Sequence, residues 1–597
     1  MEPRPEAGSS GPNWRTPAEV DEYRTTPDYA ATRRFLDRLA AAFPGQVRIE
    51  TFGRTSEGRP IDLVVVSDDG IFDPAAIHAA GRPILLVQNA IHAGEMDGKD
   101  ACLALLRDLL SGKHGAEPLG KVVWAFIPIY NVDGHERRSP YQRINQNGPA
   151  LAGWRANGAN LNLNRDYLKA DAPETRAFLR MFHRWLPDFF VDNHVTDGAD
   201  FQYDVTFRID AGPDVHPPTA AWSREVAVPE LTRHLEASGH CPFPDTIFLK
   251  DDSDPSQGLA YFENPPRFST GQMILENRPG LLVELHMLKP YRTRVAGNYE
   301  LLRALLGLLN REAETLIALN RGADRAAEEL GGGPGSAGPV PLVVAGTGQT
   351  TPIRFRGVEF VREPSEVSGG VRIRYGSKPW EATIPMETGV RIETSVTPPV
   401  AYLIPTPWTS VIEVLETHGV PLLRLTSPWS GRVERYRCTG MRWPERPFEG
   451  RHPILRGGAV EREFGRFGRC EPVVETVAFP AGSVVVPLQH RLAKVIVHWL
   501  EPAAPDSALR WGFFDAIFEQ KEDGEAYVLE SLAREMTASD PGLLAEFNAR
   551  LGDDPEFAAS PRERLQFFYR RSPWGRANQV GVYPVARLTT WEGLPLP

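Results

Sequence analysis

The sequence predicts an α/β fold for the first half of the chain, with a mostly parallel or mixed sheet flanked by helices. Short apolar runs typical of buried strands recur up to residue 287, and segments with helical periodicity alternate with them. After residue 341 the sequence pattern changes to short strand-like runs between glycines and prolines, which predicts a β-rich C-terminal module.

The expected elements of the first half follow in order. The strand-like runs are RIETFG (48–53), IDLVVVS (61–67), PILLVQNA (83–90), KVVWAFIPIY (121–130), DFFVDNH (188–194) and GLLVELHM (280–287). Helices are expected near 28–43, 97–111, 173–185 and 223–237, and one long amphipathic helix at 298–330. This alternation is typical of βαβ architecture.

The second half begins after GGGPGSAGPVP (331–341), whose glycines and prolines are typical of a flexible linker. The predicted organisation is therefore an α/β domain at 1–330, a linker at 331–341 and a β-rich module at 342–597. Its expected strands are PIRFRGVEFVR (352–362), GVRIRYG (370–376), AYLIP (401–405), SVVVPLQ (483–489) and AKVIVHWLE (493–501), with terminal helices near 521–551 and 560–571. We expect this module to pack against the first domain, with carbohydrate or peptidoglycan binding by exposed tryptophans as the alternative.

Composition excludes several classes of protein. With 597 residues, a net charge of −11 and no strongly basic block, the chain is not expected to bind nucleic acid. Its four cysteines (102, 241, 438 and 470) are too few and scattered for a disulfide framework or a structural zinc site, although a bridge between Cys438 and Cys470 is left open.

The N-terminal sequence and the apolar runs bear on localisation. No segment resembles a secretory signal, and no run of 18 or more apolar residues predicts a membrane span. We therefore expect a cytoplasmic protein, or an exported one whose signal is absent from this sequence.

Three candidate metal ligands each follow a strand-like run. His92 and Glu95 come after PILLVQNA, and His194 ends PDFFVDNH. Because ligands gather at the carboxyl edge of open α/β sheets, we expect these side chains to converge. Two imidazoles and a carboxylate are a typical catalytic zinc set, so about one zinc per chain is predicted. Glu95 alone could instead be a carboxylate favoured by the start of a helix.

A further glutamate and two arginines extend the pattern. Glu284 interrupts an apolar run, where an unpaired charge is costly, and it suits a general base that later acts as an acid. Arg165, preceded by Asn164, offers a planar fork of donors for a carboxylate. Arg155 could reach a carbonyl oxygen as it becomes an oxyanion. Read singly, each arginine is an ordinary surface ion-pair partner.

On these residues the chain resembles the carboxypeptidase A-like zinc metallocarboxypeptidases over roughly residues 15–325. The opening stretch with GRTSEGRPI (53–61) resembles the first helix and strand of that family. The resemblance implies a catalytic domain at 1–330 that removes C-terminal residues from peptides. It assigns zinc to His92, Glu95 and His194, carboxylate binding to Asn164 and Arg165, the oxyanion role to Arg155 and proton transfer to Glu284.

Some features depart from the family pattern. Arg143 is the runner-up for the oxyanion role. Only Tyr261 is available for the mobile tyrosine of the family, and its role stays unassigned. Ser269, Thr270 and Gln272, in the stretch expected to line the specificity pocket, do not indicate a charged terminal residue.

The alternative functions are an amidase on cell-wall peptides and a catalytically weak peptide-binding relative.

Overall fold

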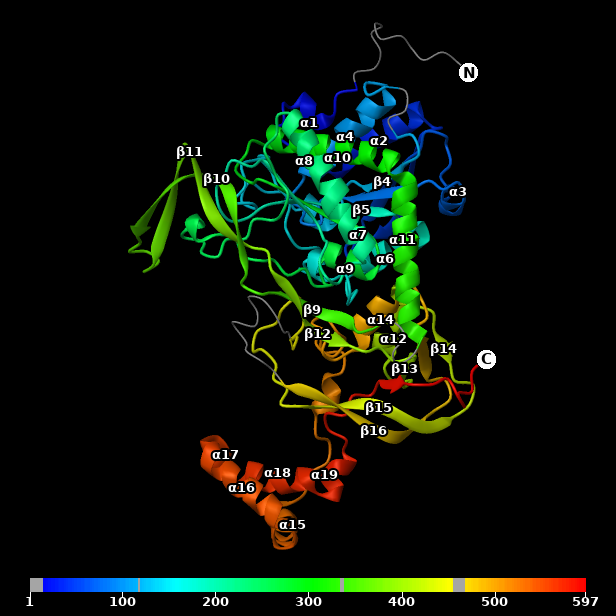
Figure 1. The fold of residues 1–597 in the computed structure, drawn as a ribbon, viewed down its shortest axis with the longest axis vertical. Helices are drawn as coiled ribbons and strands as arrows, with labels where there is room; N and C mark the ends of the chain where they lie inside the picture. The colour runs from blue at the N-terminus through cyan, green and yellow to red at the C-terminus, as the bar shows by residue number, and fades with distance from the viewer. Residues whose placement is uncertain (1–13, 116–118, 333–337, 455–467) are drawn as a thin grey trace.

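The first half of the protein is built around a mixed β-sheet. The computed structural model describes residues 14–115, 119–332, 338–454 and 468–597. Among them, eight strands lie side by side in the order β1-β2-β4-β3-β5-β8-β6-β7, in the upper part of Figure 1. The strands are β1 (Val47–Arg54), β2 (Pro60–Val66), β3 (Ile84–Gln88), β4 (Val123–Ile127), β5 (Phe189–Val195), β6 (Val205–Ile209), β7 (Pro242–Phe243) and β8 (Gly280–Leu285).

The centre of this sheet is parallel and its flanks contain antiparallel pairs. The pairs β3–β4, β3–β5, β5–β8 and β6–β7 are parallel, whereas β1–β2, β2–β4 and β6–β8 are antiparallel. The predicted α/β fold with a mixed sheet is confirmed. All six strand-like runs of the first half become strands of this sheet.

Helices cover both faces of the sheet. They are α1 (Pro17–Val20), α2 (Tyr29–Ala42), α3 (Pro74–Ala79), α4 (Asp97–Leu110), α5 (Val132–Glu136), α6 (Pro173–Trp185), α7 (Pro217–Trp222), α8 (Val228–Ala237), α9 (Ser269–Leu275), α10 (Tyr291–Arg311) and α11 (Ala313–Glu328), with short turns η1 (Leu163–Arg165), η2 (Ser223–Ala227), η3 (Pro255–Gln257) and η4 (Glu329–Gly332). On β2, Val64 faces the core shared with α2, α4 and α10, while Val65 faces the core shared with α6. Because both faces are buried, the central strands are continuous apolar runs.

The prediction of one long helix at 298–330 is wrong in one respect, because the segment forms two helices. Glu312, with φ −96° and ψ 14°, separates α10 from α11. Helix α10 packs on α4 and α8, whereas α11 packs on α7 and α14 (Ala493–Leu500). The break lets one amphipathic segment cover two differently placed surfaces.

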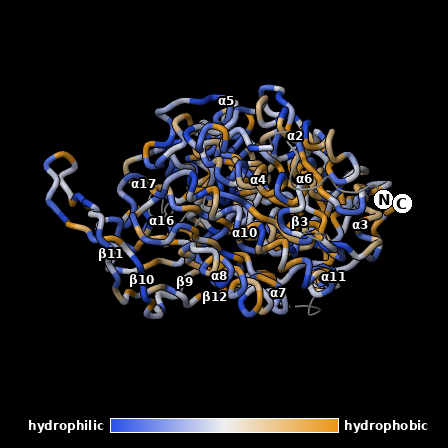
Figure 2. The backbone as a smooth tube through the Cα atoms, turned by 90° about the horizontal axis from the view of Figure 1, so that it is seen from above, coloured by the Kyte–Doolittle hydropathy of each residue, from blue (hydrophilic) through white to orange (hydrophobic). Residues whose placement is uncertain are grey.

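The second half contains further sheets and a long hairpin. A six-stranded sheet has the order β14-β17-β13-β18-β15-β16, β9 pairs with β12, and β10 pairs with β11. In Figure 2, the β10–β11 hairpin projects from one side of the molecule. The bounds are β9 (Val340–Gly346), β10 (Thr350–Pro364), β11 (Val371–Glu387), β12 (Val390–Val396), β13 (Ala401–Ile404), β14 (Leu423–Arg424), β15 (Trp429–Thr439), β16 (Arg469–Phe479), β17 (Val484–Pro487) and β18 (Ala586–Leu588).

One predicted strand of this half is wrong. AKVIVHWLE (493–501) forms helix α14 rather than a strand. All residues of α14 except Lys494 are buried, so the run is apolar on every side. Periodicity alone does not separate such a helix from a buried strand.

The remaining helices include a group at the lower end of Figure 1. They are α12 (Thr409–Thr417), η5 (Asp515–Phe518), α15 (Ala526–Ser539), α16 (Pro541–Asp553), α17 (Pro555–Ala559), α18 (Pro561–Arg571) and α19 (Pro573–Ala577). Helices α15 to α18 share a small core of their own around Phe557, Phe567 and Phe568. Among the described residues, no helix has the length and apolar character needed to cross a membrane.

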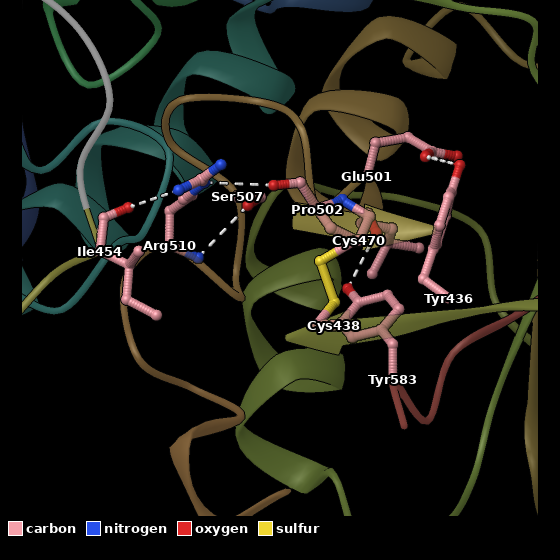
Figure 3. Close-up of a disulfide and its surroundings, with 10 residues drawn as sticks. Tyr436, Cys438, Ile454, Cys470, Glu501, Pro502, Ser507, Arg510 and Tyr583 are labelled. Atoms are coloured by element: carbon pink, nitrogen blue, oxygen red, sulfur yellow. Dashed lines mark hydrogen bonds between the residues drawn. A yellow bond between two sulfur atoms is a disulfide. The ribbon is translucent and has the colours of Figure 1, made fainter. Parts of the chain in front are cut away.

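Two cysteines of the second half are bridged. Cys438 on β15 lies opposite Cys470 on β16, with an S–S distance of 1.96 Å. Figure 3 shows the bridge next to Tyr436 and Tyr583. The bridge that the sequence left open is therefore formed in the structure.

The two halves share one hydrophobic core. Leu168 and Leu275 of the first half pack with residues of β13, β17 and α14. Leu330 and Val340, at the two ends of the expected linker, are buried in the same core, while residues 333–337 lie outside the described part of the chain. The division into 1–330, 331–341 and 342–597 stays a prediction.

Candidate metal and peptide site

His92 and Glu95 lie in the turn that joins β3 to α4. Strand β3 is central and fully buried, so its carboxyl end is held firmly where the turn begins. Gly94 lies between the two side chains, and a Cβ there would lie 2.6 Å from Arg143 Cγ and 2.9 Å from the Gly153 carbonyl oxygen. The turn therefore needs a residue without a side chain at this position.

His194 and Glu284 come from neighbouring strands. They are register partners in the parallel β5–β8 pair, so their side chains leave the same face of the sheet side by side. Asp192 lies two residues before His194 and shares that face. Two strands and one turn thus bring together residues that are up to 192 positions apart in sequence.

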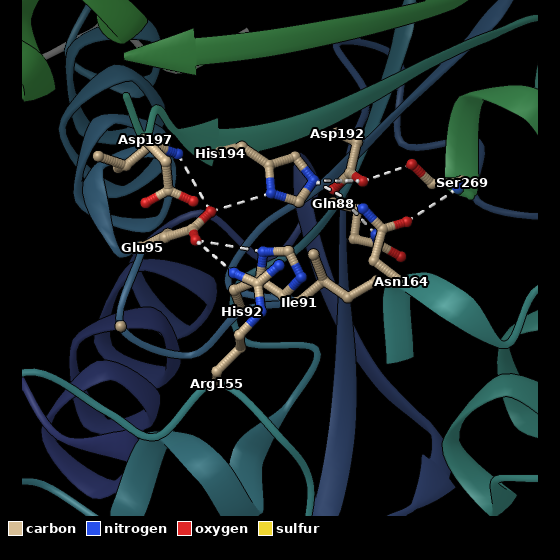
Figure 4. A network of polar contacts seen from close by, with 12 residues as sticks. Gln88, Ile91, His92, Glu95, Arg155, Asn164, Asp192, His194, Asp197 and Ser269 are labelled. Carbon is tan, nitrogen blue, oxygen red and sulfur yellow. Dashed lines mark hydrogen bonds and ion pairs between the residues drawn. The ribbon is translucent and has the colours of Figure 1, made fainter. Parts of the chain in front are cut away.

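The three predicted ligands converge on one point, as Figure 4 shows. One ligand atom each from His92, Glu95 and His194 lies within 4.8 Å of the others. Glu95 Oε1 is 3.2 Å from His92 Nδ1, and Glu95 Oε2 is 2.9 Å from His194 Nδ1. All three residues are buried.

The outward nitrogens of both imidazoles have polar partners. His194 Nε2 lies 2.8 Å from Asp192 Oδ2, and His92 Nε2 lies 3.1 Å from Asn162 Oδ1. Partners of this kind fix the ring orientation and leave the Nδ1 atoms for the shared centre. His92 Nδ1 is buried without a hydrogen-bond partner. The set of two nitrogens and a carboxylate oxygen therefore fits a zinc ion.

Burial and neighbouring charges shift the pKa values at this centre. Burial lowers the pKa of His92 to about 3, so that its ring is neutral. Burial also acts to lower the pKa of His194, but Asp192 and Glu95 outweigh it and hold that pKa well above the usual range. Burial raises the pKa of Glu284 to about 8, with His194 partly opposing the shift. A carboxyl group with such a pKa can both accept and return a proton near neutral pH.

Asn164 and Arg165 lie in the short turn η1 at the edge of the same site. Asn164 is buried, and its Oδ1 accepts a hydrogen bond of 2.9 Å from the backbone nitrogen of Ser269. The Arg165 guanidinium stacks over the Phe268 ring at 4.2 Å from its centroid. Burial and the nearby Arg155 lower the pKa of Arg165 to about 10, which still leaves it charged at neutral pH.

Both candidates for the oxyanion role lie beside Glu95. Arg143 Nη1 is 3.0 Å from Glu95 Oε1, and Arg155 Nη1 is 3.5 Å from the same oxygen. The Arg155 side chain is 38% exposed, against 12% for Arg143, and it lines the cavity in front of the ligands. The more accessible position favours Arg155.

A cavity of about 300 Å³ opens onto this centre. It is lined by all seven predicted site residues: His92, Glu95, Arg155, Asn164, Arg165, His194 and Glu284. Ser269 and Thr270 also line it, together with apolar residues such as Phe248 and Leu282. Tyr261 lies in a separate pocket beside Arg208, and Gln272 points to Glu276 instead.

Three polar residues of the site were missed in the sequence. Asp192 and Asn162 hold the two imidazoles, and Ser269 Oγ donates to Asp192 Oδ2 at 2.5 Å. Asp192 and His194 lie two residues apart in a strand, so their side chains share one face of the sheet. This spacing could have identified Asp192 from the sequence. Asn162 and Ser269 come from loops whose approach depends on the tertiary structure.

Parts of this chain are similar to known carboxypeptidases. The zinc carboxypeptidase family model matches residues 32–206. A probable carboxypeptidase 2 of Trichophyton verrucosum is 24% identical over 78% of this chain and 83% of its own length. A zinc carboxypeptidase of Simulium vittatum is 30% identical over 19% of this chain and 34% of its own.

Among solved structures, the carboxypeptidase A of Helicoverpa armigera is similar to part of the chain. The two structures match over 49% of this chain and 74% of the Helicoverpa chain, with 17% sequence identity and a TM-score of 0.37.

Proposed function

We propose that this peptide hydrolase, which is similar to the zinc carboxypeptidases, removes C-terminal residues from peptides with one zinc held by His92, Glu95 and His194. One observation carries the proposal. The three ligands and the four other predicted residues line a single cavity, with the ligand atoms within 4.8 Å of one another.

The metal has a defined part in this proposal. When bound, zinc polarises the substrate carbonyl and makes a water molecule more acidic. The buried ligand set, the bare Nδ1 of His92 and the Asp192 partner of His194 support this assignment.

Glu284 supplies the proton transfer. Its carboxylate takes a proton from the water whose oxygen bonds to the carbonyl carbon, and gives that proton to the leaving nitrogen as the C–N bond breaks. The products are a shortened peptide with a new carboxylate and a free amino acid. Arg155 donates hydrogen bonds to the carbonyl oxygen as negative charge develops there. The raised pKa of Glu284 supports this shuttle, because a carboxyl group with a pKa near the ambient pH can accept a proton in one step and return it in the next.

Substrate selection begins at the terminal carboxylate. Arg165, charged and stacked on Phe268, offers paired donors for a carboxylate, and Asn164 adds an amide beside it. A free C-terminus meets these groups at one end of the cavity while the scissile bond reaches Glu284. This arrangement explains why an exopeptidase is favoured over an amidase on cell-wall peptides, which needs no such anchor.

The test compares peptides with free and amidated C-termini. Arg165→Ala is expected to raise KM by roughly 10- to 100-fold for free C-termini, from the loss of a charge-assisted pair, and to change little for amidated ones. Arg176→Ala, a change of an arginine outside the cavity, is the control. Equal effects of Arg165→Ala on both peptides would contradict the proposed anchor.

A second measurement addresses the metal. The His92→Ala/His194→Ala protein is expected to contain one zinc fewer per chain than the wild type, because a single remaining carboxylate holds zinc weakly. Elemental analysis of both proteins gives the difference directly. An unchanged zinc content, or hydrolysis that a chelator does not inhibit, would reject the assignment.

A further inference from the structure

A second group of potential ligands lies away from the cavity, where three helices end. His183 is in the last turn of α6, Glu276 follows the end of α9, and His418 follows the end of α12. Helix C-termini carry partial negative charge. Three of them together, with a buried carboxylate, make this point favourable for a cation.

The ligand atoms are close and two of them have no partner. One atom each from His183, Glu276 and His418 lies within 4.8 Å of the others. His183 Nε2 and His418 Nδ1 are buried nitrogens without a hydrogen-bond partner. Buried polar atoms are nearly always paired, so two orphan nitrogens beside one carboxylate indicate a missing ligand.

His418 is prepared as a ligand. The residue is fully buried, and its Nε2 donates to the Leu168 carbonyl oxygen at 2.8 Å. A neutral imidazole carries one proton, so Nδ1 is left as a bare lone pair without a hydrogen-bond partner. A backbone carbonyl on the far nitrogen is the usual support of a metal-binding histidine.

Arg491 is the cation now closest to this group. Its Nη1 lies 3.2 Å from Glu276 Oε2 and its Nη2 lies 3.0 Å from His183 Nδ1. Glu276 Oε1 faces the other way, 3.7 Å from His183 Nε2, and accepts a hydrogen bond of 3.2 Å from Gln272. Because arginine only donates, His183 must accept at Nδ1 here and carry its proton on Nε2. A metal at Nε2 therefore requires that Arg491 releases His183 and keeps Glu276.

We propose that His183, Glu276 and His418 form a second, structural site for zinc. Two imidazole nitrogens and one carboxylate oxygen are donors that zinc binds in proteins. When the metal binds, the imidazole proton of His183 moves from Nε2 to Nδ1, so that one N–H bond is broken and another is formed, and Arg491 releases His183 Nδ1. The ion ties α6 and α9 of the first half to α12 of the second.

A zinc ion at this second site would affect the peptide site through α9. This helix starts at Ser269, which contacts Asp192 and Asn164, and Glu276 follows its last residue. A zinc ion held by Glu276 would restrain the C-terminal end of α9, whose first residues, Ser269 and Thr270, line the cavity. The second zinc is therefore expected to stabilise the fold and the site without touching substrate.

The experiment counts zinc in the full-length protein after chelation and reloading. We expect two zinc ions per chain in the wild type, one in the His92→Ala/His194→Ala protein, and none when His418→Ala is added. His490→Ala is the matched control, since His490 lies next to Arg491 but its Nδ1 accepts from the backbone of Leu492. This control should keep both ions.

A thermal measurement provides the second readout. Zinc should raise the Tm of the His92→Ala/His194→Ala protein, because an ion that binds only the native state stabilises it. This readout needs no change within the second group, so a folding defect of His418→Ala cannot obscure it. No zinc and no rise in Tm in that protein would overturn the proposal and leave Arg491 as the permanent cation.

Discussion

Glu284 is surrounded by groups that act on its charge in opposite directions. Burial raises its pKa, while His194 in the next strand opposes the rise. Glu284→Gln keeps the shape but removes the proton acceptor. We expect kcat to fall by roughly 10²- to 10⁴-fold with KM and zinc content nearly unchanged.

Steady-state kinetics on one peptide check this prediction. Glu174→Gln is the control, because Glu174 is also buried and pairs with Ser56 and Asn157 outside the cavity. Turnover close to wild type in Glu284→Gln would rule out its role as the base.

Asp192 holds His194, one of the three proposed zinc ligands. Its carboxylate holds His194 Nε2 at 2.8 Å and so orients Nδ1 toward Glu95. Asp192→Asn is expected to weaken zinc affinity by roughly 10- to 100-fold, in the range seen when such a partner is lost. Competition with a chelator of known affinity measures the change.

The control for Asp192 is another aspartate–histidine pair. Asp200→Asn alters the pair of Asp200 and His286, 3.0 Å apart, which does not line the cavity. Equal zinc affinities for wild type and Asp192→Asn would show that His194 is oriented without this contact.

At the scale of the elements, the base of the β10–β11 hairpin supports one wall of the cavity. Phe355 of β10 is fully buried against Phe201, Tyr203 and Leu259. Leu259 bridges to both Leu249 and Met386, so the hairpin is connected to the loop that lines the cavity with Phe248. The hairpin therefore belongs to the architecture of the site.

Phe355→Ala should test this connection. The loss of a buried aromatic ring is expected to cost about 3–5 kcal/mol of unfolding free energy and to raise KM. Phe360→Ala, farther along the same strand and only partly buried, should have a smaller effect on both. Denaturant unfolding and peptide kinetics measure the two quantities, and a stable Phe355→Ala protein with unchanged KM would contradict the connection.

At the scale of the whole molecule, the C-terminal half holds the loop that carries Asn164 and Arg165. Glu449 accepts from the Asn162 backbone at 2.8 Å, and Arg451 pairs with Asp171 through two contacts of 2.7 Å. Further on, Asp506 pairs with Arg267 beside the stacked Phe268. The second half thus positions the side of the cavity that is lined by Asn164 and Arg165.

A chain that ends after residue 330 tests this dependence. We expect fragment 1–330 to unfold more easily than the full chain and to lose activity, since Leu168 and Leu275 lose their apolar cover. Thermal unfolding and peptide hydrolysis provide the comparison. A fragment as stable and active as the full chain would reject any supporting role for the second half.

Local sequence was sufficient for the strands and helices around the site. His92 and Glu95 follow a short apolar run and His194 ends another, both runs were predicted as buried strands, and parallel strands end at a common edge. Glu284 was found because a charge inside an apolar run is costly unless it is used. These inferences need only residue type and spacing.

Other features of the structure depend on tertiary packing between segments that are far apart in the sequence. AKVIVHWLE is apolar on all sides, so only its place in the core makes it a helix. The contacts of Glu449 and Arg451 with the loop at 162–171, and the meeting of His183, Glu276 and His418, join segments up to about 290 residues apart. Spacing along the chain carries no information about such approaches, because they arise from the docking of complete elements onto a shared core.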